Sequence, residues 1–491
     1  MLVMRRFILL MLLSLAVSLP TGKTAYALDI ALPEMGDSAG ALISPREEYQ
    51  IGQAFFWRLQ QTTDLIDDPE VSHYIQSLGY HLVTYSDDPT RQFTFFVVPD
   101  PSINAFAAPG GFIGMNSGLL LTADSEDEVA SVMAHEIAHV TQRHILRSIE
   151  RSQRMTIPKT AAMIAAALLG AMDPSAGSAA IMAVQAGDIQ SQLDYTRANE
   201  SEADNFGMQT LIKSGFNPEA MPSFFEKLQQ ASRYFGGSEV PEFLRTHPVT
   251  TSRIADARGR AIQYEGEHHK PVKNTRDPLA FYLIQEKLRV LMAKSPKELL
   301  KHYEYELAKE EIKLEVAVRY GYALALLKNG EQTRARKIIQ SLIDKDRDRL
   351  AYQIAMADIE MAVGRIDAAL AIYADNYDIY PDNQALSMKY VQALLRTDRP
   401  QKAVSLLQAQ LDWGNTSRDI YKLMGQAKGD MGQTSEAHVW LSDYYYRSGL
   451  LKAAADQLQL AADSAGHDEY QRAKIASRLR EVEDAIAQME Q

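Results

Sequence analysis

The sequence predicts two folded parts in one chain: a mostly helical α+β domain with a small sheet, followed by an all-α solenoid. Helical spacing of apolar residues dominates the first part, and only residues 92–121 show the alternation and turn residues of strands. A 34-residue period runs through the second part. A polar, aperiodic segment at residues 265–278 separates the two patterns and is the expected linker.

The first 27 residues have the organisation of a secretory signal peptide. Arg5 and Arg6 precede an apolar run at residues 7–19, and residues 25–27 supply the small residues of a cleavage site. The run is too short to cross a bilayer core of about 30 Å as a helix, which favours export and removal over anchoring. Residues 28–44 are rich in Gly, Ala and Ser, and we expect a mobile leader there.

Composition excludes several classes of protein and site. The chain has no cysteine, which excludes disulfides, thiolate metal ligands and a lipid-anchored N-terminus. Its formal net charge is −12, and losing Arg5, Arg6 and Lys23 with the signal peptide makes it more acidic still. Such acidity argues against a nucleic-acid partner. An apolar fraction of 46% is typical of globular domains.

Local patterns place the elements before the central motif. Residues 47–85 carry apolar residues at helical spacing, and residues 92–98 are rich in Phe and Val and predict a strand that ends before Pro99. Residues 104–121 mix apolar residues with Gly and Pro and predict a bent hairpin. Within it, Gly110 and Gly111 permit close backbone approach.

Residues 135–139 read His-Glu-Ile-Ala-His, the spacing of a zinc-dependent peptidase. A capping box at residues 125–128 predicts that a helix begins just before them. Residues four apart share one helical face, so His135 and His139 can offer two imidazole nitrogens to one zinc ion. Glu136 then lies beside the metal as general base for the attacking water. A surface helix with two histidines is the alternative interpretation.

Residues 197–204 supply the candidate third ligand. Glu200 and Asp204 are four apart and share a helical face. We expect Glu200 to complete a site for one zinc ion per chain, and Asp204 to hydrogen-bond the far nitrogen of a ligating histidine. Glu202 points about 200° away from Glu200 on an ideal helix, and we expect it to face solvent. A solvated acidic helix end is the alternative.

These motifs together resemble the gluzincin family that contains the CAAX prenyl-protein protease and the bacterial heat-shock protease HtpX. Residues 104–113 are similar to the strand pair that borders the active-site cleft in that family. Thr246-His247-Pro248 with Arg253 is similar to its downstream histidine element. The resemblance implies a zinc metalloendopeptidase domain at residues 45–264.

The resemblance also implies a substrate-binding surface, made of Asn104, Ala105, Phe106, Gly110 and Gly111. An exposed edge strand beside the zinc would let a substrate add as a further strand through main-chain hydrogen bonds. Such binding tolerates many substrate sequences. An ordinary core hairpin is the alternative.

His247 leaves two opposite roles open. It could stabilise the developing oxyanion, or it could occupy the open position of the zinc and silence the enzyme. These roles predict opposite phenotypes when His247 is replaced, and Arg253 belongs to the same element without a separate role. A simple His-Pro turn is the third interpretation.

Residues 157–188 contain two apolar runs, each too short to cross a membrane as a helix. A buried helical hairpin is one interpretation. The alternatives are a mobile lid over the cleft, or a patch that touches the outer membrane or an unfolded client.

Residues 279–491 predict a tetratricopeptide solenoid of four repeats. Small residues recur every 34 positions, at Ala335, Ala369, Ala403 and Ala437, each preceded five positions earlier by Gly330, Gly364, Asp398 or Gly432. Residues 468–489 would form a long capping helix. The concave face of such a solenoid binds peptides or proteins. A rigid spacer is the alternative.

A secreted zinc peptidase joined to a tetratricopeptide array resembles a family of the Gram-negative periplasm. That resemblance implies a role in quality control and assembly of outer-membrane proteins, with unfolded or misassembled members as substrates. It also implies contact of the array with the barrel assembly machinery, and peripheral contact with the outer membrane. The alternative function is a non-proteolytic periplasmic chaperone or scaffold for that machinery.

Overall fold

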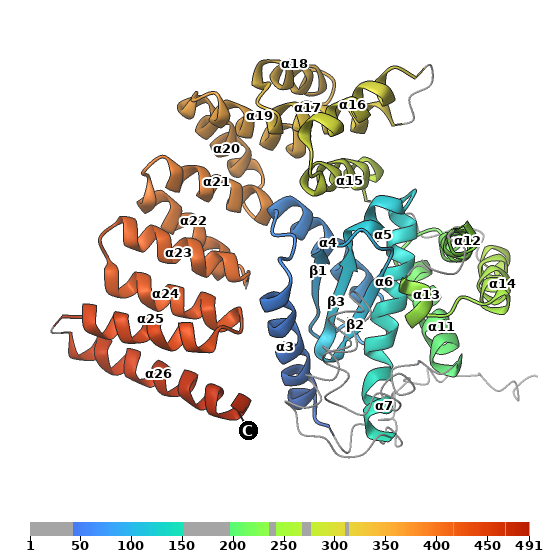
Figure 1. Ribbon diagram of the computed structural model, residues 1–491, viewed down its shortest axis with the longest axis horizontal. Coiled ribbons are helices and arrows are strands. Elements are labelled where there is room, and N and C mark those ends of the chain that lie inside the picture. The colour runs from blue at the N-terminus through green and yellow to red at the C-terminus, as the bar shows by residue number, and fades with distance from the viewer. Residues whose placement is uncertain are drawn as a thin grey trace, which may run out of the picture.

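The computed structural model describes residues 43–151, 197–234, 242–267, 276–309, 314–415, 417–466 and 468–490. The expected signal peptide, nearly all of the expected leader and the apolar segment 157–188 lie outside these residues. Within the described ranges, no helix is both long and apolar enough to cross a membrane. Figure 1 shows a sheet-containing part beside an arc of stacked helices.

The small sheet has three strands in the order β1-β3-β2. β1 pairs with β3 in parallel, and β2 pairs with β3 antiparallel, so β2 lies at one edge. The elements up to this sheet are α3 (Pro45–Thr62), α4 (Pro69–Thr84), β1 (Thr94–Val98), β2 (Ala105–Ala108), the 3-10 turn η1 (Pro109–Gly111) and β3 (Phe112–Asn116). The helical pattern at residues 47–85 is thus two helices, because Asp68 caps α4 and Pro69 occupies its first turn.

The turn between β2 and β3 is packed by the chain itself. Gly110 and Gly111 have φ of 74° and 85°, which favours glycine. A Cβ on Gly110 would lie 2.7 Å from the Cα of Tyr49, and one on Gly111 would lie 2.1 Å from the carbonyl oxygen of Gln92. The close approach at these glycines is therefore made by the chain's own backbone. This differs from the expectation that they face a substrate.

Helix α6 (Glu126–Thr141) lies between the sheet and helices α11–α14 (Figure 1). Ser125 caps α6 by accepting a hydrogen bond from the backbone N–H of Glu128. The other helices of this part are α5 (Ser117–Thr122), α7 (His144–Arg151), α11 (Arg197–Lys213), α12 (Ala220–Tyr234), α13 (Glu242–Thr246) and α14 (Thr251–Glu267). The inner apolar residues of α6, α11 and α12 share one hydrophobic core with α4 and the sheet.

The second part is a solenoid of helical pairs, which confirms the predicted fold class. The residues preceding four of its helices adopt left-handed φ: 82° at Gly330, 78° at Gly364, 56° at Asp398 and 76° at Gly432. The helices are α15 (Pro278–Met292), α16 (Pro296–Leu307), α17 (Glu315–Lys328), α18 (Gln332–Ile343), α19 (Leu350–Ala362), α20 (Ile366–Ile379), α21 (Gln384–Arg396), α22 (Pro400–Asp412), α23 (Arg418–Asp430), α24 (Thr434–Arg447), α25 (Leu451–Ser464) and α26 (Glu469–Glu490).

The two parts share a helix. Phe281 and Leu288 of α15 are buried in the core of the first part, whereas Leu283 and Val290 of the same helix are buried in the core of the first solenoid helices. Helix α14 ends at Glu267, inside the expected linker, and α15 begins at Pro278. Helix α15, immediately after the expected boundary, thus packs against both parts.

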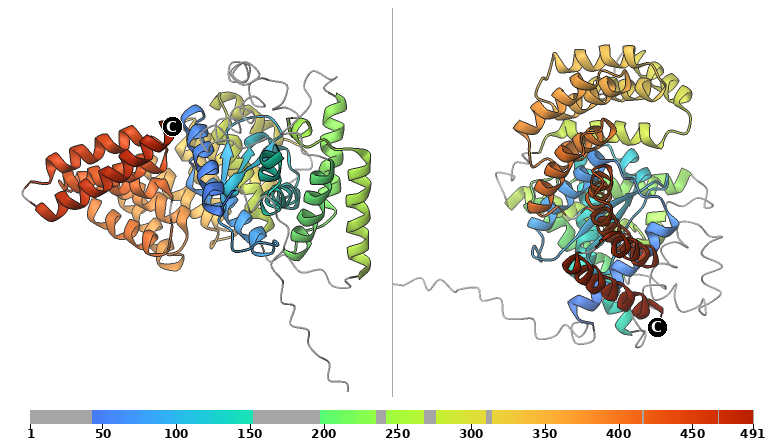
Figure 2. Two further views of the ribbon diagram at one scale, coloured as in Figure 1. Left: turned by 90° about the horizontal axis from the view of Figure 1, so that it is seen from below. Right: turned by 90° about the vertical axis from the view of Figure 1, so that its left-hand side faces the viewer.

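The far end of the solenoid returns to the first part and contacts α3 (Figures 1 and 2). The Trp57 indole N–H donates to the carbonyl oxygen of Arg447 at 3.0 Å, and the Gln61 amide donates to that of Gly449 at 3.2 Å. A Cβ on Gly449 would lie 2.3 Å from Trp57, so glycine permits this contact. Two separate junctions therefore hold the solenoid against the sheet-containing part.

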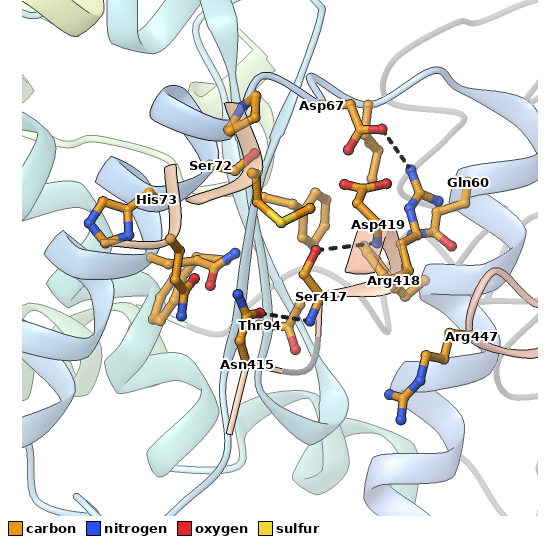
Figure 3. Close-up of a pocket in the computed structure, with 18 of the residues that line it drawn as sticks. Gln60, Asp67, Ser72, His73, Thr94, Asn415, Ser417, Arg418, Asp419 and Arg447 are labelled. Atoms are coloured by element: carbon orange, nitrogen blue, oxygen red, sulfur yellow. Dashed lines mark hydrogen bonds and ion pairs between the residues drawn. The ribbon is translucent and has the colours of Figure 1, made fainter. Parts of the chain in front are cut away.

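Between these junctions lies a pocket of about 550 Å³, lined by α3, α4, β1 and solenoid helices including α21 and α23. Figure 3 shows Asp67 from the first part beside Asp419 and Arg418 of the solenoid. Arg418 lies 3.8 Å from the Asp67 carboxylate. Burial, together with the carboxylate and hydrogen bond of Asp67, raises the pKa of Asp419 to about 7.

Replacing Asp419 with asparagine is expected to stabilise the protein more strongly as pH rises. A folded pKa of about 7 lies above the unfolded value, so the stability associated with the protonated carboxyl is fully present below the unfolded pKa and is lost progressively as pH rises to about 7. Asp419→Asn, which resembles the protonated acid, should therefore hardly change the free energy of unfolding near pH 3.5 and should raise it by on the order of a few kcal/mol near pH 8. Guanidinium unfolding at both pH values measures this, with the exposed Asp412→Asn as control. An equal effect at both pH values would contradict the assignment.

Candidate metal centre and active site

Helices α6 and α11 cross at a glycine and bring the predicted metal ligands together. A Cβ on Gly207 of α11 would lie 3.1 Å from the Cα of His135 on α6, so the two backbones nearly touch there. Two turns before Gly207, Glu200 faces the same helix. The carboxylate oxygens of Glu200 lie 3.5 Å from Nε2 of His135 and 3.5 Å from Nε2 of His139.

Four buried residues converge on one point. One donor atom from each of His135, His139, Glu200 and His247 lies within 4.8 Å of the other three. Nε2 of His139 is 3.0 Å from Nε2 of His135, and Nδ1 of His247 is 3.1 Å from Glu200 Oε1. No more than 2% of any of these residues is exposed. The sequence-predicted ligands are thus close neighbours, and His247 lies among them.

The carboxylate on the far side of His135 tests whether this group fits a metal. Nδ1 of His135 lies 3.0 Å from Oδ1 of Asp204. A carboxylate only accepts, so Nδ1 of His135 carries the proton, and a metal at Nε2 would bind to the lone pair of that nitrogen. That lone pair faces the nitrogen of His139 and the carboxylate of Glu200, which are also acceptors. A cation satisfies all three, and two imidazoles with a carboxylate form a donor set that zinc prefers.

Arg253 holds both carboxylates of the centre. Its Nε and Nη2 each donate to Asp204 at 2.7 Å, and its Nη1 lies 2.8 Å from Glu200. Burial alone would raise the pKa of Asp204, but hydrogen bonds from Arg253 and His135 lower it. Burial likewise opposes the charge of Glu200, yet the imidazoles of His247 and His135 hold its pKa well below the usual range. Both carboxylates therefore stay ionised, as metal binding and ligand orientation require.

Glu136 is placed to move a proton. Its side chain is fully buried, and its Oε1 lies 3.6 Å from Nε2 of His247, a distance too long for a hydrogen bond. Burial raises the pKa of Glu136, against the opposing charges of His247 and His135. A desolvated carboxylate beside a candidate metal centre has the properties of a general base.

His247 is held by the short helix α13. Its ring stacks on Phe243 with centroids 4.8 Å apart, and its backbone N–H donates to the carbonyl oxygen of Phe243 at 2.7 Å. The backbone N–H of Phe243 donates in turn to the carbonyl oxygen of Ile103, two residues before β2. α13 thus connects the donor group to the beginning of the edge strand.

Comparison with known proteins identifies the family. The model of peptidase family M48 matches residues 69–261, and a tetratricopeptide repeat model matches residues 360–427. The beta-barrel assembly-enhancing protease of Escherichia coli K12 is 33% identical over 92% of this chain and 91% of its own length. The chain belongs to the family of beta-barrel assembly-enhancing proteases. A relative from Vibrio cholerae is 35% identical over 83% of each chain.

More distant similarity covers a smaller share of the chain. The mitochondrial metalloendopeptidase OMA1 of Arabidopsis thaliana is 31% identical over 32% of this chain and 29% of its own length. As a beta-barrel assembly-enhancing protease of the M48 class, the protein is a metalloprotease, and zinc is its cofactor. The family model spans α4 to α14, the elements that hold all four donor residues.

Within this M48 fold, the predicted substrate residues lie on or beside β2. Ala105 belongs to the core shared with α6. The Phe106 ring belongs to a second core that includes α3, where its centroid lies 6.1 Å from that of Phe55. Asn104 is buried, and its carbonyl oxygen accepts from the backbone N–H of Asn116. These side chains therefore point into the protein. In the described part of the chain, β3 is the one strand that pairs with β2.

Two residues next to the donor group are absent from the predicted set. Glu202, expected to face solvent, has its side chain only 33% exposed and lies 3.2 Å from Nε2 of His144. His144 in turn contacts His139 through its other ring nitrogen. The sequence signal was a third histidine, five residues after His139, whose position depends on the turn between α6 and α7.

Proposed function

We propose that this protein is a periplasmic zinc metalloendopeptidase that degrades misassembled outer-membrane β-barrel proteins and assists the assembly of others. The observation that carries the proposal is the buried group of His135, His139 and Glu200 with the buried carboxylate of Glu136 beside it. The names of relatives that match more than 80% of the chain support barrel assembly as the process.

In this proposal each residue of the centre has one role. His135, His139 and Glu200 hold the metal, Asp204 orients His135, and Arg253 holds Asp204 and Glu200 in place. Zinc bound here supplies a Lewis acid that polarises the scissile carbonyl and makes a water molecule acidic. Glu136 accepts the proton of the attacking water and delivers it to the leaving amine.

The substrate would bind along the edge of β2. An extended peptide can add to this edge through main-chain hydrogen bonds, and Asn104, Ala105 and Phe106 would contribute backbone groups because their side chains are buried. Recognition of this kind reads an unpaired strand rather than a sequence. A β-barrel protein that has failed to close exposes such strands, which makes it a suitable substrate.

The solenoid would present clients and the barrel assembly machinery to the protease. We divide the chain into a peptidase domain at residues 45–264 and a repeat domain at residues 279–491. Contacts at α15 and at Trp57 fix the repeat domain against the peptidase domain. A partner bound by the repeats is therefore held at a defined place relative to the metal centre. Contact with the outer membrane would come through such partners.

Removing Glu200 is expected to remove the metal. Glu200→Ala removes the carboxylate from the donor group, so the purified variant should contain far less than one zinc per chain. Asp204→Ala keeps every ligand and should weaken zinc binding about 10- to 100-fold, as loss of an orienting partner does. Zinc content and a chelator-competition titration measure both effects, with Glu219→Ala as control. If Glu200→Ala binds zinc as tightly as the wild type, the ligand assignment is wrong.

A further inference from the structure

His139 is supported on its far side by a chain of three buried or half-buried groups. Nδ1 of His139 lies 2.8 Å from Nδ1 of His144, whose side chain is completely buried. Nε2 of His144 lies 3.2 Å from Oε2 of Glu202, and Arg147 donates to the same oxygen at 3.0 Å. The contacts run in one line from α6 through α7 to α11.

The donors and acceptors along this line determine which nitrogen of each ring carries the proton. The Glu202 carboxylate only accepts, so Nε2 of His144 carries the proton. Nδ1 of the neutral His144 ring is then an acceptor, and the partner it faces, Nδ1 of His139, must donate. The proton on Nδ1 of His139 leaves the lone pair on Nε2, the nitrogen that faces Glu200 and His135. Glu202 therefore determines, through His144, which nitrogen of His139 is free for a metal.

We propose that His144 and Glu202 are positioning residues of the metal centre that fix the tautomer and the ring orientation of His139. This inference rests on the proposed role of His139 as a ligand. It makes the supports of the two histidines different: a carboxylate, Asp204, backs His135, whereas a neutral imidazole backs His139. A neutral acceptor draws the proton of its partner less strongly than a carboxylate does, so His139 is the less basic of the two ligands.

A tight turn between α6 and α7 places His144 beside His139. Arg143 adopts φ of 55°, a left-handed conformation that ends α6 and returns the chain so that His144 lies over His139. The Arg143 side chain anchors this turn, because its Nη2 donates to the carbonyl oxygen of Ile43 at 3.0 Å and its Nε lies 3.4 Å from Glu48. These contacts offset the strain of the left-handed turn and hold the chain where His144 lies beside His139.

Three variants test this proposal, because each leaves a different group beside Nδ1 of His139. His144→Leu removes the acceptor and should weaken zinc binding about 10- to 100-fold. His144→Asn offers an amide oxygen at nearly the position of Nδ1 and should recover most of that affinity. Glu202→Leu keeps the ring but frees its tautomer, so its loss should fall between these two. The exposed His302→Asn serves as the control.

The measurements are the zinc dissociation constant by chelator competition, the visible spectrum after cobalt(II) substitution, and the thermal unfolding of the metal-free protein. We expect weaker binding and an altered cobalt spectrum for His144→Leu, near recovery of both for His144→Asn, and similar unfolding of the metal-free forms. Wild-type affinity in His144→Leu would overturn the proposal, and so would equal losses in the Leu and Asn variants. If His139→Ala itself binds zinc like the wild type, the proposed ligand set fails instead.

Discussion

Replacing Glu136 with glutamine is expected to leave zinc bound and to abolish detectable peptide hydrolysis. The amide keeps the size of the side chain and the change removes none of the proposed ligands, so the metal centre should stay intact. Glutamine cannot accept the proton of the attacking water, and loss of a general base slows such reactions about 10²- to 10⁴-fold. Cleavage of casein and of an unfolded outer-membrane protein, with zinc content measured on the same samples, tests both parts.

Two controls make the result specific. Glu219→Gln makes the same chemical change outside the metal centre and should cleave like the wild type. Zinc content should equal that of the wild type in both variants. Equal cleavage by Glu136→Gln and the wild type would refute the mechanism. A Glu136→Gln protein that has lost zinc would instead place Glu136 among the ligands.

The residues that the sequence placed correctly are those whose geometry is local. Histidines four apart on one helix share a face in any protein, so His135 and His139 could be paired without knowing the fold. The same holds for the 34-residue period, because each repeat contacts its neighbours in a similar way. The division of residues 47–85 into α3 and α4 was not predicted, although Asp68-Pro69 is a helix start that the sequence contains.

His144 and Glu202 could not be placed in this way. Glu202 reaches His144 only because α6 and α11 cross closely at Gly207 and the chain reverses at Arg143, and neither feature follows from local spacing. An ideal helix wheel put Glu202 on the face opposite Glu200. That position is occupied by α7, which the wheel does not include.

The division of α15 between two cores was equally hidden. Phe281 and Leu283 are neighbours in the same apolar pattern, yet one is buried in the first part and the other in the solenoid. A helix with apolar residues on two faces indicates burial on both sides but does not name the partners. The contact of Trp57 with Arg447 joins residues 390 apart in the sequence, and no periodicity connects them.

His247→Ala is expected to raise the cleavage rate above that of the wild type. Nδ1 of His247 lies 3.1 Å from Glu200 and 3.4 Å from Nε2 of His135, so it fits the position of a fourth ligand. Four protein groups around a tetrahedral zinc leave no position for water. On the same helix, the backbone N–H of Phe243 donates to the carbonyl oxygen of Ile103. This acceptor at the beginning of the proposed substrate edge is therefore already used. Both observations favour an idle resting enzyme that becomes active when α13 moves away.

The opposite role predicts an opposite result of similar size. If His247 stabilises the oxyanion through Nε2, its loss should slow cleavage about 10²- to 10³-fold. Under repression, casein cleavage and self-cleavage should both rise, on the order of 10-fold, because the variant no longer has to populate an open state first. Adding Glu136→Gln to His247→Ala should abolish both activities, which shows that the gain arises at the same centre, and the exposed His302→Ala should behave like the wild type. A uniformly slower His247→Ala protein would assign this histidine to the transition state, since removal of a repressive ligand cannot reduce the rate of an enzyme that retains its zinc and its general base.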